Sequence, residues 1–422
     1  MTLQSKRIEI GNGIYLNLIQ SDKFKSNILS YYFVRPLSRE EVTKNSLLPL
    51  VLKRGTKDFN TNLEIEKELE SMYGANLSIS VNKRGERQVI RFTMEWANGQ
   101  YLLNEEYNLE VIGMLRNIIY NPYLENDVFK KEYVNQEKEN LKNKIDSKIN
   151  DKRSYAVNRC IEEMCKYEKF SLYPLGYVED LKLIDETNLY DHYQDILNTS
   201  PIEIYFVGNY DDNLISYLIE NNKITRENIV EIPREKIISP VQRKNMIEEK
   251  FDVNQGKLVL GYRTDIPYED KLYNGLLLAG DILGGGPNSK LFKNVREAES
   301  LAYYVSSTIL KYKSIMIIDG GIEFENYNKT IDIINKQIDS LKSGDFSDDD
   351  IGISKKAIKT SIESIKDSVF LISEFFFSQG VSKDLRSLEE ILADFEIVTR
   401  DEIITAAKRI VMDTIYFMKN KN

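Results

Sequence analysis

Apolar and polar residues alternate with a period of two in several N-terminal stretches, and helical periodicity separates these stretches. Four stretches predict strands: residues 13–19, 28–34, 77–81 and 88–95, of which the first, third and fourth alternate. Between the second and the third, Ser38-x-x-Glu41 and Thr61-x-x-Glu64 have the form of capping boxes, and each predicts the start of a helix. Gly74 stands where glycine commonly ends a helix. The pattern therefore predicts two strands, two helices and a hairpin.

The second half of the chain repeats this order of elements. It predicts a strand, an apolar helix and two further strands, at residues 257–263, 273–283, 302–308 and 314–320. One constant shift also superposes four residues of the first half on identical residues of the second: Asn45, Leu47, Leu48 and Gly55 on Asn274, Leu276, Leu277 and Gly284. Helices from Ser347 and from Thr399, where Thr399-x-x-Glu402 is another capping box, complete the second half. We therefore expect an α+β protein with two related domains, each a mainly antiparallel β-sheet with helices packed on it.

The boundary between the domains is predicted in a segment that contains Pro233 and Pro240. We expect an N-terminal domain at residues 1–230, a linker at 231–250 and a C-terminal domain at 251–422. A chain of 422 residues is long enough for two domains of ordinary size.

Composition excludes some classes of function. A hydrophobic content of 42% with 29% charged residues is typical of soluble globular proteins. No apolar run approaches the roughly 20 residues that span a bilayer, and the N-terminus has no apolar core of a signal peptide. Cys160 and Cys165 form neither a CxxC pair nor a disulfide framework, so we expect reduced buried thiols. Together these features lead us to expect a cytoplasmic location and no membrane partner. A net charge of −9 argues against nucleic acid and is compatible with cationic peptides.

The segment from Asp281 to Ser307 has the most specific pattern in the chain. Its three glycines, Gly284, Gly285 and Gly286, predict a sharp turn with open amide groups, because glycine adopts positive φ without a Cβ penalty. Asn288 or Ser289 is expected to cap the helix that follows, and a strand comes next. By itself, such a turn is more often a loop between two packed elements than a functional motif.

The whole segment resembles the C-terminal domain of the insulinase/pitrilysin family of zinc peptidases, the inverzincins, in the branch that includes mitochondrial processing peptidase. In that family a glycine-rich turn precedes S-x-L-F-x-x-V-R-E and then L-A-Y, and the chain matches this pattern in order from Ser289 to Tyr303. The resemblance covers most of the chain. It implies two related domains that face each other across a chamber. It also implies that Arg296 and Tyr303, beside the glycine turn, contact a substrate peptide.

The same resemblance identifies a missing metal site. An inverzincin binds zinc through H-x-x-E-H on a helix, where two imidazoles share one face and the glutamate acts as general base. The chain contains a single histidine, His192, so this motif cannot occur in it. Counting back from a Gly-Thr dipeptide that the family usually has after the motif, we place the three positions at Ser46, Pro49 and Leu50.

The residues around these positions also differ from a metal site. Pro49 would kink a helix that begins at Ser38, or it would lie in the first turn of a helix that restarts at Ser46. The family's third ligand, a glutamate on a later helix, corresponds to Lys144, which donates no lone pair while it is protonated. Glu137 of the same pattern is kept, and Glu132 and Glu139 offer alternative registers for the ligand. His192 lies in an amphipathic segment, and we expect it to be structural.

In the family that the chain resembles, one subunit can carry H-x-x-E-H while a sister chain lacks it but keeps the Arg/Tyr pair and the glycine-rich turn. The resemblance therefore implies that this chain is a catalytically inactive subunit of a two-chain zinc peptidase. Arg296 would bind a peptide carbonyl or carboxylate through its planar donors, and Tyr303 would donate to the scissile carbonyl oxygen. A sister chain of similar length that contains H-x-x-E-H would supply the zinc, and this chain would hold no cofactor. The structural alternative is that Arg296 pairs with Glu297 or Glu299 and that Tyr303 packs in a sheet.

Two other functions compete with this one. The chain could be a non-catalytic scaffold, like the core subunits of the respiratory complex that is built on this fold. A self-sufficient enzyme of unknown chemistry is disfavoured by the histidine count. The stretch 155–166 looks most like bacterial cytosolic members of this family that are associated with the aminopentanol modification of elongation factor P. Those members are encoded beside a sister chain that contains H-x-x-E-H. Whether the chain forms a homodimer without such a partner stays open.

Overall fold

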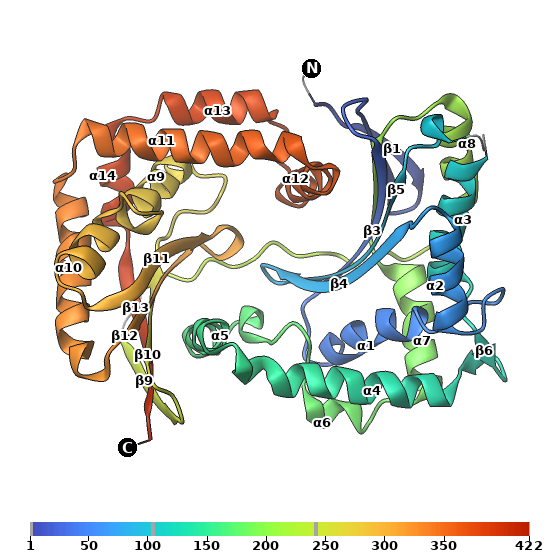
Figure 1. The fold of residues 1–422 in the computed structure, drawn as a ribbon, viewed down its shortest axis with the longest axis horizontal. Coiled ribbons are helices and arrows are strands. Elements are labelled where there is room, and N and C mark those ends of the chain that lie inside the picture. The colour runs from blue at the N-terminus through green and yellow to red at the C-terminus, as the bar shows by residue number, and fades with distance from the viewer. Residues whose placement is uncertain (1–2, 103–105, 240–243, 422) are drawn as a thin grey trace. The chain divides into compact units, whose positions relative to one another are not determined.

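The structure is a computed structural model that describes residues 3–102, 106–239 and 244–421 (Figure 1). It divides into two compact units. Unit 1 consists of Met1–Asp146, Leu172–Pro233 and Ser364–Ser387, and unit 2 consists of Ser147–Ser171, Arg234–Glu363 and Leu388–Asn422. Ser147–Ser171 was expected in the N-terminal domain but belongs to unit 2, and Ser364–Ser387 was expected in the C-terminal domain but belongs to unit 1. Within the described ranges, none of the helices combines the length and the hydropathy of a membrane-spanning segment.

Unit 1 is built on a six-stranded sheet in the order β1-β2-β8-β3-β5-β4, and only the β2–β8 pair is parallel. Its strands are β1 (Lys6–Gly11), β2 (Ile14–Gln20), β3 (Ser26–Pro36), β4 (Asn76–Arg84), β5 (Arg87–Ala97) and β8 (Ile202–Gly208). Strand β3 is buried on both faces. Tyr31 and Phe33 belong to one core, and Tyr32 and Val34 belong to the core on the other face.

Helices of the first half cover the face that carries Tyr31 and Phe33. The core helices are α1 (Val42–Leu52), α3 (Tyr107–Tyr120) and α7 (Glu186–Thr199). Around them lie α2 (Asn62–Ser71), α4 (Lys131–Asp146), α6 (Val178–Leu181), α8 (Asp212–Asn221) and the short hairpin β6–β7 (Leu124–Glu125, Val128–Phe129).

The other face of this sheet is covered by a helix from the second half of the chain, α12 (Val369–Ser382). The ring of Phe377 stacks on Tyr32 with centroids 4.0 Å apart. The hydroxyl of Tyr205 donates to the backbone oxygen of Phe376 at 3.2 Å. A segment far away in the sequence thus completes the second core of unit 1.

Unit 2 has a five-stranded sheet in the order β11-β12-β10-β13-β9, in which only β13–β9 is parallel. Its strands are β9 (Asn245–Phe251), β10 (Gly256–Arg263), β11 (Ala302–Leu310), β12 (Ile315–Ile322) and β13 (Val411–Asn420). Strands β4-β5-β3-β8-β2 of unit 1 follow the same order with the same parallel pair. The predicted α+β class with two related halves is therefore confirmed.

The helices of unit 2 are α9 (Tyr273–Gly284), α10 (Tyr327–Ser343), α11 (Asp348–Glu363), α13 (Leu388–Glu396) and α14 (Arg400–Lys408) (Figure 1). A helix of the first half, α5 (Lys152–Met164), packs on the sheet beside Val259. It holds Cys160, while Cys165 follows it, and both are buried free thiols, as predicted. The exchange is reciprocal, because α5 completes unit 2 as α12 completes unit 1.

Buried ion pairs fix the segment Ser147–Ser171 on unit 2. Glu168 accepts a hydrogen bond from Arg263 of β10 and forms an ion pair with Lys313, in each case at 2.7 Å. Arg263 also donates to Asp413 of β13 at 2.8 Å. Burial raises the pKa of Glu168, but the hydrogen bonds from Lys313 and Arg263 outweigh it and hold that pKa below its ordinary value. The exchanged segment therefore depends on charges that other strands supply.

The predicted strands and most of the predicted caps are present. Thr61 and Thr399 each form a reciprocal capping box, with Glu64 and Glu402. The box at Ser38 is wrong, because α1 begins at Val42 and its cap residue makes no side-chain bond to the helix.

The carboxylate of Glu41 is held elsewhere, which explains the missing cap. It accepts from Arg35 at 2.7 and 3.0 Å, and the side chain of Arg35 is 4% exposed. The expected linker also needs correction, because β9 begins inside it at Asn245. Pro240 of that linker lies outside the described residues.

Candidate functional site

Helix α1 holds the positions where the resemblance places the zinc-binding motif. Pro49 lies in the interior of the helix, although α1 begins at Val42 and not at Ser38 or Ser46 as considered above. Ser46 is 2% exposed, and its hydroxyl donates to the backbone oxygens of Val42 at 3.1 Å and Pro174 at 2.9 Å. Leu50 is half-buried against the core. The first ligand position is thus committed to internal hydrogen bonds.

A closed network of side chains fills the space beside Ser46. The amide nitrogen of Gln88 donates to the backbone oxygens of Val42 and Pro174, at 3.0 and 2.8 Å. Because carbonyl oxygens only accept, the Gln88 oxygen must accept from the nitrogen of Asn45, at 2.8 Å. The Asn45 oxygen then accepts from Nε2 of His192 at 2.7 Å. Nε2 of His192 therefore carries a proton, and the side chain has a structural role.

The stability of the protein should depend on the charge of this histidine. Burial lowers the pKa of His192 from 6.5 to about 4. Because the unfolded chain binds the proton first, stability is present above pH 6.5 and is lost as the pH falls toward 4. Between pH 7.5 and pH 5 we expect a loss of about 2 kcal/mol from this group.

The measurement is the free energy of unfolding by urea at both pH values, for the wild type and for His192→Gln. The glutamine amide can still donate to Asn45 but does not titrate. The variant should therefore lose about 2 kcal/mol less stability than the wild type between pH 7.5 and pH 5. His192 is the sole histidine of the chain, and the difference between the two proteins therefore isolates it from the carboxylates. Equal pH dependence in both proteins would contradict the assignment.

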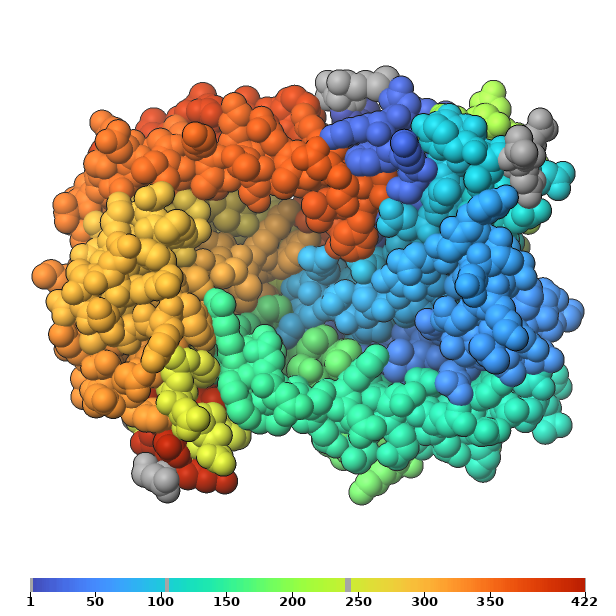
Figure 2. Space-filling model, in the orientation of Figure 1, coloured from blue at the N-terminus to red at the C-terminus, as the bar shows by residue number. Residues whose placement is uncertain are grey.

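Helix α4, which the resemblance makes the source of the third ligand, lies at the surface (Figure 2). Lys144 is exposed there, as are Glu132 and Glu139. Glu137 is the buried acid of this helix, 6% exposed, and its carboxylate lies 3.5 Å from the guanidinium of Arg54. Glu137, the one glutamate of the family pattern that this chain retains, is thus paired with Arg54 of the same chain.

The residues present do not fit a zinc site of this family. In the ranges that the structure describes, no group of three or more His, Cys, Asp or Glu side chains could hold a metal ion. Ser46 is engaged with carbonyl oxygens, and Lys144 carries a positive charge on an exposed helix face. No step of a reaction is therefore assigned to a metal on this chain.

The glycine turn exists, but for a different reason from the one predicted. None of Gly284, Gly285 and Gly286 has a positive φ. A Cβ on Gly284 would lie 2.6 Å from the backbone nitrogen of Ser307, and a Cβ on Gly285 would collide with the carboxylate of Asp281. A Cβ on Gly286 would meet no atom within 4 Å. Two of the glycines are therefore needed for close approach, not for a left-handed backbone.

The helix after the turn begins as predicted. The hydroxyl of Ser289 accepts from the backbone N–H of Phe292 at 3.4 Å and donates to the oxygen of Gly286 at 2.6 Å, so Ser289 rather than Asn288 makes the cap. The helix continues with a π-helical stretch, Phe292–Glu297. Such stretches are rare and occur frequently at functional sites.

Arg296 and Tyr303 line the same open pocket, whose volume is about 370 Å³. Its other residues are Ser300, Leu301, Ala302 and Glu323. Tyr303 lies at a bulge in β11, because Ala302 pairs with Ile322 while Tyr304 pairs with the next residue, Gly321. The side chain of Tyr303 is 66% exposed. A bulge commonly turns a side chain out of its sheet, and here the tyrosine faces solvent.

Arg296 does not have the partners of the structural alternative. Its guanidinium lies 4.6 Å from the ring centroid of Phe292, and it forms no ion pair with a described residue. Glu299 pairs instead with Lys329 at 2.6 Å. The planar donors of Arg296 are therefore open to an external group.

Glu323 is a pocket residue that the sequence did not single out. It is half-buried, and its carboxylate makes no hydrogen bond or ion pair with any residue that the structure describes. Glu323 directly follows Ile322, which pairs with Ala302 at the start of β11. Only this strand register brings it beside Tyr303. The pocket thus presents one cation, one acid and one phenol.

Comparisons with known proteins agree with this combination of a two-unit fold and a lost metal site. Residues 184–358 match a family described as the peptidase M16 inactive domain. The chain is 37% identical over 409 residues to the probable inactive metalloprotease YmfF of Bacillus subtilis, with 96% of each chain covered. It is 24% identical over 257 residues, 56% of this chain, to the uncharacterized zinc protease YmxG of the same organism.

Solved structures show the same fold. A conserved protein from Enterococcus faecalis superposes with a TM-score of 0.91 at 27% identity, over 99% of both chains. A peptidase M16 inactive domain from Pseudomonas fluorescens has a TM-score of 0.80 at 14% identity, over 100% of this chain and 99% of that one. These proteins define a class of two-unit peptidase folds. The chain belongs to the M16 peptidase family, as an inactive homologue of its metallopeptidases.

Proposed function

We propose that this chain is the substrate-binding, non-catalytic subunit of a two-chain zinc peptidase. The observation that carries the proposal is the pocket in which Arg296 and Tyr303 are both accessible, and neither side chain forms an ion pair or hydrogen bond with a described residue. A zinc-bearing chain with H-x-x-E-H would supply the metal and the general base. The 24% identity to a protein named as a zinc protease supports a partner of the same fold.

The chemistry of the pocket suits a peptide main chain. The guanidinium of Arg296 can bind a carbonyl or carboxylate oxygen with two parallel N–H donors. The exposed hydroxyl of Tyr303 can donate to an oxygen on which charge develops. The lone carboxylate of Glu323 favours a peptide that is neutral or cationic near this point, as does the net charge of −9. We place the complex in the cytoplasm, which suits two buried thiols.

The test uses the assembled complex with its H-x-x-E-H partner. Arg296→Ala should lower kcat/KM for peptide cleavage by about 10- to 100-fold, because a hydrogen bond to a charged group contributes roughly 1.5–3 kcal/mol. Tyr303→Phe should lower it by about 10-fold, since one neutral donor is lost. The two chains should still elute together in size-exclusion chromatography.

A matched control is Arg409→Ala in the same unit. The side chain of Arg409 is 46% exposed and lies 3.7 Å from Asp265, so its removal should change neither cleavage nor assembly. Unchanged kcat/KM in both pocket variants would refute substrate binding here and would support the scaffold function instead.

A further inference from the structure

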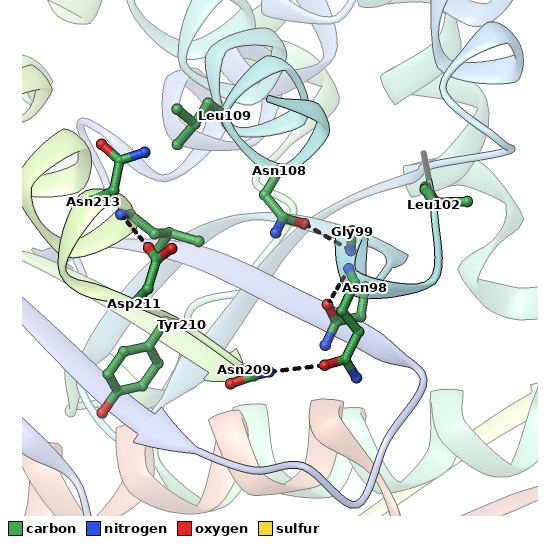
Figure 3. Close-up of a pocket in the computed structure, with 11 residues that line it drawn as sticks. Asn98, Gly99, Leu102, Asn108, Leu109, Asn209, Tyr210, Asp211 and Asn213 are labelled. Atoms are coloured by element: carbon green, nitrogen blue, oxygen red, sulfur yellow. Dashed lines mark hydrogen bonds between the residues drawn. The ribbon is translucent and has the colours of Figure 1, made fainter. Parts of the chain in front are cut away.

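A second pocket lies in unit 1, where strands β5 and β8 end and helices α3 and α8 begin (Figure 3). Its volume is about 540 Å³. Five side-chain amides line it, together with one carboxylate: Asn98, Gln100, Asn108, Asn209, Asn213 and Asp211. No lysine or arginine is among the described residues that line it. The described part of the pocket is therefore polar, with no cationic side chain for an anion.

The orientation of the Asn108 amide is fixed by its neighbours. Its oxygen accepts from the indole nitrogen of Trp96 at 2.9 Å and from the backbone nitrogen of Gly99 at 3.2 Å. Both of these groups can only donate, so the oxygen cannot exchange places with the nitrogen. Figure 3 shows the Asn108 nitrogen turned toward the interior of the pocket. Asn108 thus presents a preorganised N–H donor to whatever enters.

Asn98 supplies a second donor. Its oxygen accepts from the backbone nitrogen of Gln100 at 3.1 Å, which fixes the amide in the same way. Asn98 is 2% exposed, and its nitrogen has no hydrogen-bond partner among the described residues. A buried amide nitrogen without a partner is uncommon in native proteins and calls for an explanation. An oxygen atom of a bound molecule would satisfy it.

The remaining polar groups limit the charge of that molecule. The Asn209 amide nitrogen donates to Gln100 at 3.0 Å and its oxygen accepts from Gln20 at 2.8 Å. Asn209 therefore lines the pocket with an amide that is already hydrogen-bonded. Across the pocket, the carboxylate of Asp211 accepts from the backbone nitrogen of Leu214 at 2.8 Å, where it caps α8 (Figure 3). An anion would face Asp211 without a cationic partner. A neutral molecule with both oxygen acceptors and hydroxyl donors meets no such penalty.

We propose that this pocket binds a neutral polyhydroxylated small molecule, namely a sugar of one or two rings. Each hydroxyl is both donor and acceptor, so neighbouring hydroxyls can accept from Asn98 and Asn108 while another donates to Asp211. The donors come from a loop and from helix starts, not from a strand edge, where an extended peptide would pair. The site lies wholly in unit 1 and does not depend on the peptidase proposal.

The test measures binding of glucose, maltose and N-acetylglucosamine to the full chain by saturation-transfer NMR and titration. Acetate and glucose 6-phosphate probe for anions, and glycylglycinamide probes for a peptide main chain. At least one of the three neutral sugars should bind more tightly than every other probe. Absence of saturation transfer from all three sugars would overturn the proposal, as would tighter binding of an anion or of the peptide amide.

Two variants locate the binding site. Asn108→Asp keeps the oxygen that Trp96 and Gly99 contact but replaces the inward donor with an acceptor, so the Kd for the sugar should rise at least 10-fold. Asn108 makes hydrogen bonds within the fold, so its substitution could also destabilise the protein. A second variant therefore changes an exposed residue at the rim of the pocket. Asn213→Trp places a bulky ring there and should also block binding. The control Asn82→Asp changes an exposed amide on β4 and should leave Kd unchanged. An unchanged Kd in Asn213→Trp would refute this location.

Discussion

Replacing Glu168 with glutamine should destabilise the protein by about 3 kcal/mol, because breaking a buried ion pair by removing one partner typically costs about 3–5 kcal/mol. The side chains of Lys313 and Arg263 are 0% and 7% exposed, and Glu168 contacts both at 2.7 Å. Glutamine keeps the shape of the side chain but leaves these two cations with one carboxylate fewer. The measurement is the free energy of unfolding in urea, read from both near-UV and far-UV circular dichroism.

A double variant separates the charge from the packing. Glu168→Gln with Lys313→Met removes one charge of each sign, so its loss of stability should be smaller than the sum of the two single losses. The control is Asp367→Asn, which breaks an exposed pair with Lys23 whose side chains are 54% and 72% exposed. Surface pairs of this kind contribute up to about 1 kcal/mol. If Glu168→Gln costs no more than this control, the ion pairs do not hold the exchanged segment in place.

Local sequence patterns were sufficient to predict part of the fold, but strands β1, β8, β9 and β13 were not predicted. Strands β3 and β10 are buried on two faces, and short apolar runs within their sequences indicate this. Thr61 and Thr399 cap their helices through bonds to residues three positions away, which a short sequence window contains. The repeated order of elements was visible for the same reason.

The exchange of helices between the units could not be predicted in this way. Helix α12 is largely apolar, which indicates that it packs on a core but not against which sheet. The stacking of Phe377 on Tyr32 joins positions hundreds of residues apart in the chain. The failed cap at Ser38 has a partly local cause, because Glu41 bonds to Arg35 six positions earlier, and Arg35 is also bonded to Asp195 of α7.

The candidate site was predictable only in part. The count of one histidine excluded the zinc motif without any structural knowledge. Arg296 and Tyr303 were found by resemblance, and the structure adds that they line one pocket. Glu323 was missed because its place there depends on the register between β11 and β12. The Asn45–Gln88 bond was missed as well, since it joins a helix to a strand of the sheet.

The second large effect is expected at the glycine turn. Gly284→Ala should destabilise the protein by about 3 kcal/mol, the upper end of the cost of overpacking in a close-packed region. Its Cβ would lie 2.6 Å from the backbone nitrogen of Ser307 and 3.0 Å from that residue's Cβ. Backbone atoms of a paired strand cannot rotate away as a side chain can, so α9 and β11 must separate. The measurement is again the free energy of unfolding in urea.

Gly286→Ala is the matched control two residues further along. Its Cβ would meet no atom within 4 Å, and its φ is not in the left-handed region. Alanine there restricts only the unfolded chain, so stability should rise by about 0.4–1 kcal/mol. Equal effects at both positions would show that the turn needs flexible glycines in general. Opposite effects would show that Gly284 sets the spacing between α9 and the strand that carries Tyr303, so Gly284→Ala should also weaken peptide cleavage by the complex.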